Sequence, residues 1–385
     1  MMRRIFSDYA YGAGPRSNCW WDETCPAPIW PQLQGDQTVD VAIIGGGFTG
    51  LSAALHMSEA GLRVAVLEAE TPGWGASGRN GGFCCLGGAK LGARAMARLH
   101  GSQETQVYQA GEEAAVHLVE QLIARYGINA DTHSQGETVM AHSAKARAAL
   151  KPDAENEQAE FIDAPQLAAQ GLGGNFHGAL TTPVGFALNP RKYLFGLADA
   201  AQAAGAVLYQ NSPAVRLHQD GKHWHAVTPR GQLRAAQMVI ATNGYSSENL
   251  PDWLAARYMP AQSTVMVTRP ITPDEQAMQG WTSEQMAYDT RHMLHYFRLM
   301  PDGRFLFGMR GGLTSSPRAE QKIRSLLRSH FEGLFPKWTH VETTHSWSGM
   351  VCLSRNLVPF VGAVPDHQGL FAGLCYHGNG VAMGS

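Results

Sequence analysis

Hydrophobic residues recur along the chain with two different spacings, and the change between them marks the expected elements. Val41 to Ile44 is a short apolar run of the kind that forms a strand buried on both faces of a parallel sheet. From Leu51 apolar residues recur at helical spacing, and Gly61 is expected to end that helix. A second apolar run, Val64 to Leu67, is followed directly by Glu68. This stretch therefore predicts a strand, a helix and a second strand in succession.

Three glycines, Gly45, Gly47 and Gly50, join the first strand to the helix with the spacing G-x-G-x-x-G. The first allows a tight turn, the second lets the backbone approach a pyrophosphate, and the third lets the helix pack closely on the strand. Glu68 stands at about the distance from them that is expected for a carboxylate that binds ribose hydroxyls. A strand–helix–strand unit without a ligand would not explain the glycines and the acid together, so we predict a dinucleotide site here.

The rest of the chain returns to this pattern only after a long interruption. The elements expected before it returns are an extended arm at 1–37, a glycine-rich loop at 71–92, one helix at 93–126, a strand at 138–141 and a helical surface segment at 153–160. Those expected afterwards are a helix from Pro190, a strand at 206–209, a meander at 213–240, antiparallel strands at 262–268 and 294–309, a helix at 319–331, and strands at 358–361 and 370–372. An antiparallel-sheet lobe is therefore expected to be inserted between discontinuous segments of a dinucleotide-binding α/β lobe.

Composition narrows the classes of function. The 385 residues carry a formal net charge of −2, which gives no electrostatic case for binding nucleic acid or an anionic membrane surface. No apolar run approaches the roughly 18–20 residues that span a bilayer, and the residues after Met1–Phe6 are too polar for a signal peptide. Six cysteines are too few for a disulfide scaffold, and the histidines lack partners at the spacing of metal ligands. We expect a protein of the reducing cytoplasm with no metal site.

Several separate motifs carry a resemblance to a known family. They are IGGGFTGLSAALHMSEAG with Glu68, GWGASGRNGG at 73–82, PAVRL at 213–217, IATNGYSS at 240–247, and SRNLVPFVG followed by YHGNGVAM near the end. Together they resemble the D-amino-acid-oxidase-like superfamily of FAD-dependent amine oxidoreductases, with the closest likeness to its gamma-glutamylputrescine oxidase branch. The resemblance covers about residues 18–385, and the GASGRNGG loop is its most specific part. It implies FAD, rather than NAD, as the tightly held cofactor.

The resemblance also implies which residues hold that cofactor. The loop at 76–81 would line the pyrophosphate and flavin, the backbone of Val215 would pair with adenine, and a turn at 242–244 would lie on the phosphate side. The glycine turn at 378–381 would open a helix and aim backbone N–H groups at the flavin. The complete set is Gly45, Gly47, Phe48, Thr49, Gly50, Glu68, Ala76, Ser77, Arg79, Asn80, Gly81, Val215, Thr242, Gly244, Gly378, Asn379, Gly380 and Val381.

Some relatives bind FAD covalently through a Cys or His. The family's C-terminal Cys position falls near Gly349, three residues before Cys352, and the GASGRNGG loop contains no His. Noncovalent FAD is therefore expected, with Cys352 as a small buried residue.

Three residues are expected to act on the substrate. Tyr296 and His295 alternate on one strand, so only one of them can face the flavin, and we expect Tyr296 to form a pocket wall. Relatives that oxidise α-amino acids often hold the carboxylate with an Arg whose position falls here near Val351, which favours an amine or a remote carboxylate as substrate. Arg298 is the best alternative clamp, unless it is a solvated strand residue. His377 would position substrate or oxygen, or be a hydrogen-bonded structural histidine.

The resemblance thus implies a Rossmann-like FAD-binding lobe of discontinuous segments (38–95, 180–250 and 340–385), an antiparallel-sheet substrate lobe (96–179 and 251–339) and an N-terminal arm (1–37). The implied reaction oxidises a primary or secondary amine, such as a gamma-glutamylated polyamine, to an imine and then an aldehyde, with O2 or another electron acceptor. One alternative is a D-amino acid dehydrogenase or sarcosine-type amino acid oxidase. Another is a flavin-binding protein without turnover, since the family's last helix would run on where this sequence ends at Ser385.

Overall fold

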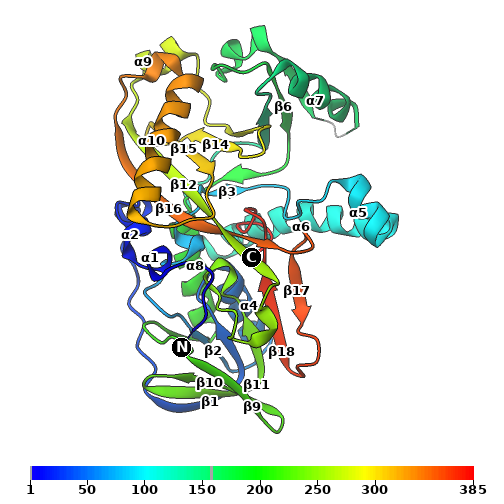
Figure 1. Cartoon of the computed structure of the whole chain (residues 1–385), viewed down its shortest axis with the longest axis vertical. Helices are drawn as coiled ribbons and strands as arrows, with labels where there is room; N and C mark the ends of the chain where they lie inside the picture. Colours follow the sequence, from blue (N-terminus) through cyan, green and yellow to red (C-terminus); the bar gives the residue numbers. More distant parts are fainter. Residues whose placement is uncertain (1, 157–158) are drawn as a thin grey trace.

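Two sheets organise the computed structural model of the chain, which describes residues 2–156 and 159–385. Each sheet has eight strands, and Figure 1 shows one in the lower half of the molecule and the other in the upper half. A third, small pairing joins β3 (Phe83–Cys84) to β7 (Phe186–Ala187) near the boundary between them. The predicted mixed α/β class is therefore confirmed.

The first sheet contains the parallel strands that the opening pattern predicted. β1 (Gly35–Ile44) pairs in parallel with β2 (Val64–Leu67) on one side and β11 (Gly231–Ile240) on the other. The remaining strands are β8 (Val207–Tyr209) beyond β2, β18 (Leu370–Leu374) and β17 (Phe360–Ala363) beyond β11, and the neighbouring β9 (Arg216–Asp220) and β10 (His223–Thr228). Residues from both ends of the chain thus contribute to one sheet.

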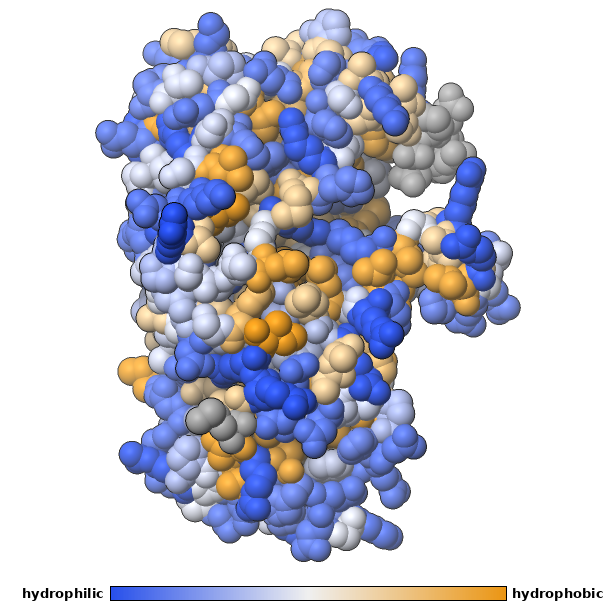
Figure 2. Space-filling view, viewed as in Figure 1, coloured by the Kyte–Doolittle hydropathy of each residue, from blue (hydrophilic) through white to orange (hydrophobic). Residues whose placement is uncertain are grey.

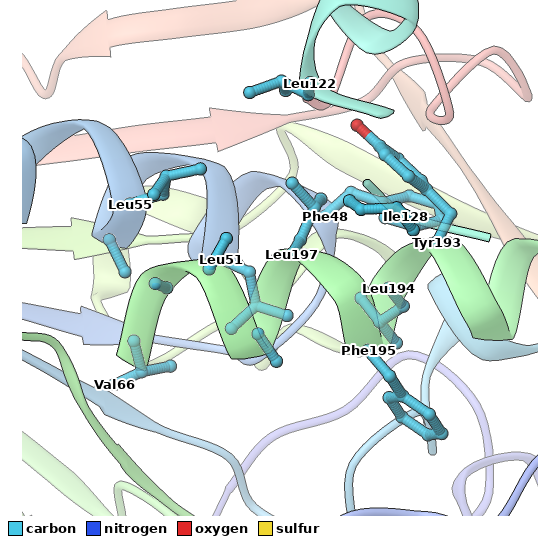
Figure 3. Close-up of a cluster of buried hydrophobic side chains, with 14 of the residues drawn as sticks. Phe48, Leu51, Leu55, Val66, Leu122, Ile128, Tyr193, Leu194, Phe195 and Leu197 are labelled. Atoms are coloured by element: carbon cyan, nitrogen blue, oxygen red, sulfur yellow. The ribbon is translucent and has the colours of Figure 1, made fainter. Parts of the chain in front are cut away.

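Two helices pack together beside this sheet. α4 (Phe48–Glu59) follows the glycine turn, and α8 (Pro190–Ala203) begins where the Asn189 side chain accepts hydrogen bonds from backbone N–H groups of its first turn. Figure 3 shows Leu51 of α4 and Leu197 of α8 within the buried hydrophobic cluster that joins them. Each of these fully buried leucines stabilises the fold by about 1.5–3 kcal/mol, so the start of α4 is held firmly in place.

The second sheet is mostly antiparallel, as the alternating strands predicted. Its order is β16 (Thr343–Ser354), β12 (Tyr258–Pro270), β15 (Arg304–Arg310), β14 (His295–Leu299), β13 (Met286–Asp289), β4 (Glu137–Met140), β6 (Gly178–Thr182) and β5 (Glu160–Asp163). Only β13 and β4 pair in parallel among these neighbours. The predicted amphipathic helix is α10 (Pro317–Leu334), whose Phe331 packs against Phe305 and Phe307 of the sheet.

Two expectations about the first part of the chain were wrong. The N-terminal arm is not simply extended, because it contains the short helices α1 (Asp8–Tyr11), α2 (Ala13–Arg16) and α3 (Trp21–Thr24). The single helix expected at 93–126 is broken into α5 (Ala93–His100) and α6 (Ser102–Tyr126), which project from the body in Figure 1. The break falls at Gly101, whose φ of 98° no α-helix contains.

Two further helices complete the description of the main elements. α7 (Ala144–Asn156) contains the first half of the segment expected to be helical at 153–160, and β5 begins at the last residue of that segment. Residues 157–158 lie outside the described residues. α9 (Pro273–Gln279) precedes β13. The predicted lobe boundaries remain a prediction. The segment 340–385 was assigned to the FAD-binding lobe, but its first strand, β16, pairs within the second sheet. In the part of the chain that the structure describes, no helix has the length and apolar character needed to cross a membrane. In the same part, no cluster of three His, Cys, Asp or Glu side chains is arranged to hold a metal ion.

Candidate active site

A cavity of about 210 Å³ lies where β1, β2 and β11 end and α4 begins. Open parallel sheets bind their ligands at this edge, outside the carboxyl ends of the strands. The cavity brings together residues that lie far apart in the sequence. Those among them that were predicted to bind the cofactor are Gly45, Gly47, Phe48, Thr49, Glu68, Ala76, Ser77, Asn80, Thr242, Gly378, Gly380 and Val381.

The glycine turn presents unpaired hydrogen-bond donors at this cavity. Within the described residues, the backbone N–H groups of Gly47 and Thr49 have no acceptor, because the first turn of a helix lacks partners for them. The Phe48 N–H donates to the hydroxyl oxygen of Ser77 at 3.0 Å, which joins the start of α4 to the loop at 76–81. A helix N-terminus also carries partial positive charge, so this corner suits a phosphate.

The spacing of the three glycines has a structural cause at each position. Gly45 has a φ of 110°, which a residue with a side chain rarely adopts. A Cβ on Gly50 would lie 1.9 Å from the carbonyl oxygen of Gly45, so glycine is needed for α4 to pack this closely on the strand end. A Cβ on Gly47 would lie 2.9 Å from Oγ of Ser77 and would fill the space between the turn and the facing loop.

Glu68 ends β2 with its carboxylate at the same corner of the cavity. Oε2 accepts a hydrogen bond from the Gly46 N–H and Oε1 accepts one from the Glu70 N–H, each at 3.0 Å. Burial raises the pKa of Glu68, and these hydrogen bonds oppose that rise because they stabilise the charged form. The carboxylate is thus fixed in orientation, as a group that accepts hydrogen bonds from ribose hydroxyls requires.

A second cavity, of about 260 Å³, lies between the first sheet's loops and the second sheet. The second sheet contributes one wall, which includes Ser263 of β12, Tyr296 of β14 and Arg310 of β15. Figure 2 shows hydrophobic residues gathered at mid-height of the molecule, between its two halves. The two cavities share the lining residues Ala76, Asn80, Met350, Val351, Gly378 and Val381. A molecule held in the first cavity can therefore present one end to the second.

Arg79 lies at the junction of the two cavities. Its guanidinium lies 5.6 Å from the ring centre of Trp74 and 5.5 Å from that of Tyr245, and both rings line the first cavity. Nε donates to the Trp74 carbonyl oxygen at 2.6 Å and Nη1 to the Ser348 carbonyl oxygen at 3.2 Å. Nη2 is buried and has no partner within the described residues, and burial lowers the pKa of Arg79. A positive charge is thus fixed beside the place where the two cavities meet.

Tyr296 and His295 point to opposite faces of their strand, as the alternation predicted. Tyr296 lines the second cavity, where its hydroxyl lies 2.9 Å from Oγ of Ser263. His295 is buried on the other face, where Nδ1 lies 2.6 Å from the Asp289 carboxylate and Nε2 lies 2.8 Å from Nδ1 of His330. Tyr296 is therefore in position to contact a substrate, and His295 is not.

Arg298 and His377 lie outside both cavities, so neither lies where contact with the substrate was expected. His377 instead agrees with the alternative of a hydrogen-bonded structural histidine, and Arg298 is buried rather than solvated. Nη2 of Arg298 donates to the Leu188 carbonyl oxygen and Nη1 lies near Nε2 of His133, each at 2.8 Å. Arg298 shares a face with Tyr296, but it lies two residues further along the strand, roughly 7 Å away, where buried side chains cover it. His377 is also buried: Nδ1 contacts the Gly88 carbonyl oxygen at 2.6 Å, and Nε2 accepts from the Ser354 N–H at 3.1 Å.

Six residues expected to touch the cofactor do not line the first cavity, and three of them line neither cavity. Val215 is exposed and its N–H donates to the Val227 carbonyl oxygen, so this N–H is not available to adenine. The two residues before it, Pro213 and Ala214, line the cavity instead. Gly50 and Gly244 lie behind the lining and act through close packing, since a Cβ on Gly244 would lie 3.2 Å from Cβ of Met350. Arg79, Gly81 and Asn379 line the second cavity.

Besides Ser263, sequence reasoning missed four polar residues that line the second cavity: Lys90, Glu137, Tyr288 and Arg310. The signal for Arg310 was present in the hairpin of β14 and β15. Its register places Tyr296 opposite Gly308, and a residue two positions beyond Gly308 faces the same side. The others come from a loop and two strands whose pairing is not local in the sequence, so no comparable signal existed for them.

The donors and acceptors of the first cavity fit FAD. The unpaired N–H groups at the start of α4 suit a pyrophosphate, and the oriented carboxylate of Glu68 suits ribose hydroxyls. The fixed charge of Arg79, which lines the second cavity and lies against two rings of the first, suits a polar edge of the flavin.

Known proteins resemble this chain over most of its length. Residues 40–385 match the family described as FAD dependent oxidoreductase (DAO). The gamma-glutamylputrescine oxidoreductase of Escherichia coli (strain K12) is 30% identical over 354 residues, which cover 89% of this chain and 80% of that protein. The probable oxidoreductase OrdL of Rhizobium meliloti (strain 1021) is 30% identical over 378 residues, 94% of this chain and 85% of that one. The crystal structure of glycine oxidase from Geobacillus kaustophilus matches with a TM-score of 0.73 and 21% identity, over 90% of this chain and 91% of that chain.

Proposed function

This chain belongs to the DAO family of FAD-dependent oxidoreductases, and we propose that it oxidises the C–N bond of a primary or secondary amine. The substrate would be gamma-glutamylputrescine or a related amino compound, the substrate class named for its relative from Escherichia coli. The substrate carbon next to nitrogen loses a hydride, which is one proton with two electrons, and nitrogen loses a proton, so that a C=N bond forms. The resulting imine then takes up water to give an aldehyde and the released amine or ammonia. FAD, when bound, accepts the two electrons and passes them to O2 or another acceptor.

The observation that carries this proposal is the wall that the two cavities share. The first cavity has the donors and acceptors that suit a dinucleotide, and its far end is formed by Ala76, Asn80 and Gly378. The same residues border the second cavity, which has room for a small molecule and is closed on the other side by the second sheet. A cofactor held in the first cavity would therefore meet a substrate held in the second.

The chain's own residues would hold the cofactor without a covalent bond. The start of α4 and Glu68 would bind it, the charge of Arg79 would lie beside its flavin end, and the backbone near Ala214 would replace Val215 beside the adenine. Cys352 lines the first cavity, but burial raises the pKa of its thiol well above the usual range. A protonated thiol is a poor nucleophile, so this cysteine supports noncovalent binding.

The walls of the second cavity would orient the amine and exclude water. Tyr296 is fixed from two sides, because its hydroxyl contacts Ser263 and its ring lies edge-on to Phe83 at 5.7 Å. Cβ atoms at Gly81 and Gly308 would lie 2.8 Å and 2.2 Å from this ring, so it sits directly against the backbone on both sides. A rigid wall of this kind holds a substrate carbon in one orientation.

The test is the visible spectrum of the purified protein, recorded without oxygen before and after the addition of single compounds. A yellow protein that is bleached by gamma-glutamylputrescine, and less readily by glycine, sarcosine or D-alanine, is the expected result. Gly47→Val serves as the flavin-free control, because its larger side chain would occupy the space beside Ser77. Bleaching by α-amino acids alone would replace the proposal with amino acid oxidation. A yellow protein that none of these compounds bleaches would contradict it.

A further inference from the structure

Arg310 is a cation without a partner in the second cavity. It is the last residue of β15 and pairs across the sheet with Ser263 of β12. Within the residues that the structure describes, its guanidinium makes no hydrogen bond or ion pair, whereas that of Arg298 on the neighbouring strand is bonded on two nitrogens. Burial lowers the pKa of Arg310, so the charge is held away from water. A buried guanidinium without an anion is costly, and such a site favours the arrival of one.

The surroundings of Arg310 add positive charge. Lys90 lines the same cavity at its rim and is also without a side-chain partner in the described part of the chain. Counting Arg79, three of the lining side chains are cationic, while Glu137 is the one carboxylate among them. The cavity thus carries an excess of positive charge that a substrate carboxylate would balance. A guanidinium also offers two parallel N–H donors, which match the two oxygens of a carboxylate.

The sheet register shows which lining residue of the second sheet supplies positive charge. Ser263 pairs with Gly349 of β16 on one side and with Arg310 of β15 on the other, so the Cα atoms of Gly349 and Arg310 are two strand spacings apart, roughly 10 Å. Gly349 and the next two residues, Met350 and Val351, line the second cavity and carry no charge. Among the described lining residues of this sheet, the cation that a substrate carboxylate would meet is therefore Arg310.

We propose that Arg310, assisted by Lys90, forms an anion subsite that binds the carboxylate of the amine substrate, which in gamma-glutamylputrescine lies at the end away from the terminal C–N bond. This inference rests on the proposed function. It narrows the substrate class to amines that carry a carboxylate. It also explains why an uncharged Val351 is compatible with a substrate that has a carboxylate.

Arg310 also contacts Gly378, and this contact suggests an alternative role in binding the cofactor. A Cβ on Gly378 would lie 2.2 Å from Nη2 of Arg310 and 3.0 Å from Cζ, so the guanidinium rests on the glycine turn that borders both cavities. A cation in that place would also suit the cofactor itself. The two roles differ in what a substitution changes: a subsite affects only compounds with a carboxylate, whereas a cofactor contact affects every substrate and FAD retention.

The test compares two amines on the FAD-loaded protein: gamma-glutamylputrescine, and N-butyrylputrescine, which has the same reacting end and amide but no carboxylate. Arg310→Met should raise the dissociation constant of the first by about tenfold or more and change that of the second by less than about twofold. Arg310→Lys should restore part of the affinity because it keeps the charge. Arg94→Met is the matched control, since this exposed arginine of α5 lies outside both cavities and should change neither value.

A calorimetric titration with glutarate, which has no amine, tests the subsite even if neither amine is oxidised. Glutarate should bind the wild-type protein and the Arg94→Met variant, and bind Arg310→Met at least about tenfold more weakly. Equal weakening of both amines, or loss of FAD from Arg310→Met and Arg310→Lys alike, would overturn the subsite in favour of a cofactor contact. Absence of glutarate binding to the wild-type protein would overturn it as well. Oxidation failing while glutarate binds would instead count against the proposed function.

Discussion

Replacing glycine by alanine should have opposite effects in two helices of this protein. Gly50 lies in the first turn of α4, and Gly111 lies in the middle of α6 on its exposed face. Alanine favours a helix over glycine by about 0.8–1 kcal/mol, so helix propensity alone predicts that both substitutions stabilise the protein. Packing separates them. A Cβ on Gly111 meets no atom within 4 Å, whereas a Cβ on Gly50 would lie 1.9 Å from the Gly45 carbonyl oxygen.

The size of the effect at Gly50 follows from that distance. Because real Cβ atoms essentially never approach another heavy atom within 3.0 Å, α4 would have to move away from the strand end by about 1 Å or more. Overpacking of this kind costs about 1–3 kcal/mol, which outweighs the gain in helix propensity. The movement would also displace the N–H groups of Gly47 and Thr49 that face the first cavity. FAD affinity should therefore fall by at least about tenfold, the cost of losing one hydrogen bond to a charged group.

Two measurements test the predicted effects of Gly50→Ala and Gly111→Ala. Urea unfolding of the FAD-free proteins should place the midpoint of Gly111→Ala above that of the wild-type protein and the midpoint of Gly50→Ala below it. Titration of each FAD-free protein with FAD, followed by quenching of flavin fluorescence, should give a weakened affinity for Gly50→Ala alone. The reasoning is refuted if Gly50→Ala is as stable as Gly111→Ala, or if it binds FAD as tightly as the wild-type protein does.

Two further predictions concern the charges of the site. Glu68→Gln replaces one of two accepting oxygens by a donor and leaves a buried N–H unpaired, so FAD affinity should fall by about tenfold or more in the same fluorescence titration. Burial and the nearby Arg310 lower the pKa of Lys90 to about 8, so Lys90 is charged below that pH and neutral above it. Glutarate should therefore bind fully below pH 8 and more weakly as the pH rises through 8, a dependence that Lys90→Met should abolish. The neighbouring Cys85 and His377 do not titrate in this range, since burial raises the pKa of the first and lowers that of the second. A pH dependence that persists in Lys90→Met would contradict the assignment.

The cofactor half of the site was predictable because its determinants are local. The turn at 45–50, the helix after it and Glu68 lie within one strand–helix–strand unit, and each residue has a steric or hydrogen-bonding reason to be there. The loop at 76–81 was predictable only through its resemblance to a family, because its partners are far away in the sequence. Arg79, for example, contacts the carbonyl oxygen of Ser348. No local pattern encodes such a contact.

For the substrate half of the site, the sequence predicted which face of the strand carries the cavity but not how far the cavity extends along it. Period-two alternation put Tyr296 and Arg298 on the face of β14 that carries the second cavity, and the structure agrees about the face. The alternation could not show that the cavity ends before Arg298. The residues that bond the Arg298 guanidinium there, His133 and Leu188, come from other segments of the chain. The cation that does line the cavity lies at the end of the next strand. A face is a property of one strand, whereas a pocket depends on how several strands are aligned.

Gly378 meets two structural requirements, of which the sequence indicated only the first. A glycine-rich turn beside the flavin segment suggested a backbone that approaches the cofactor, and its φ of 109° agrees with that reading. The structure adds a second reason, since a side chain here would also displace the guanidinium of Arg310. The turn that borders the cofactor cavity and the cation proposed to bind the substrate carboxylate are therefore in direct contact. Because the two are in contact, a side chain at position 378 would disturb the cofactor cavity and the cation together, so the two halves of the site are coupled through this one glycine.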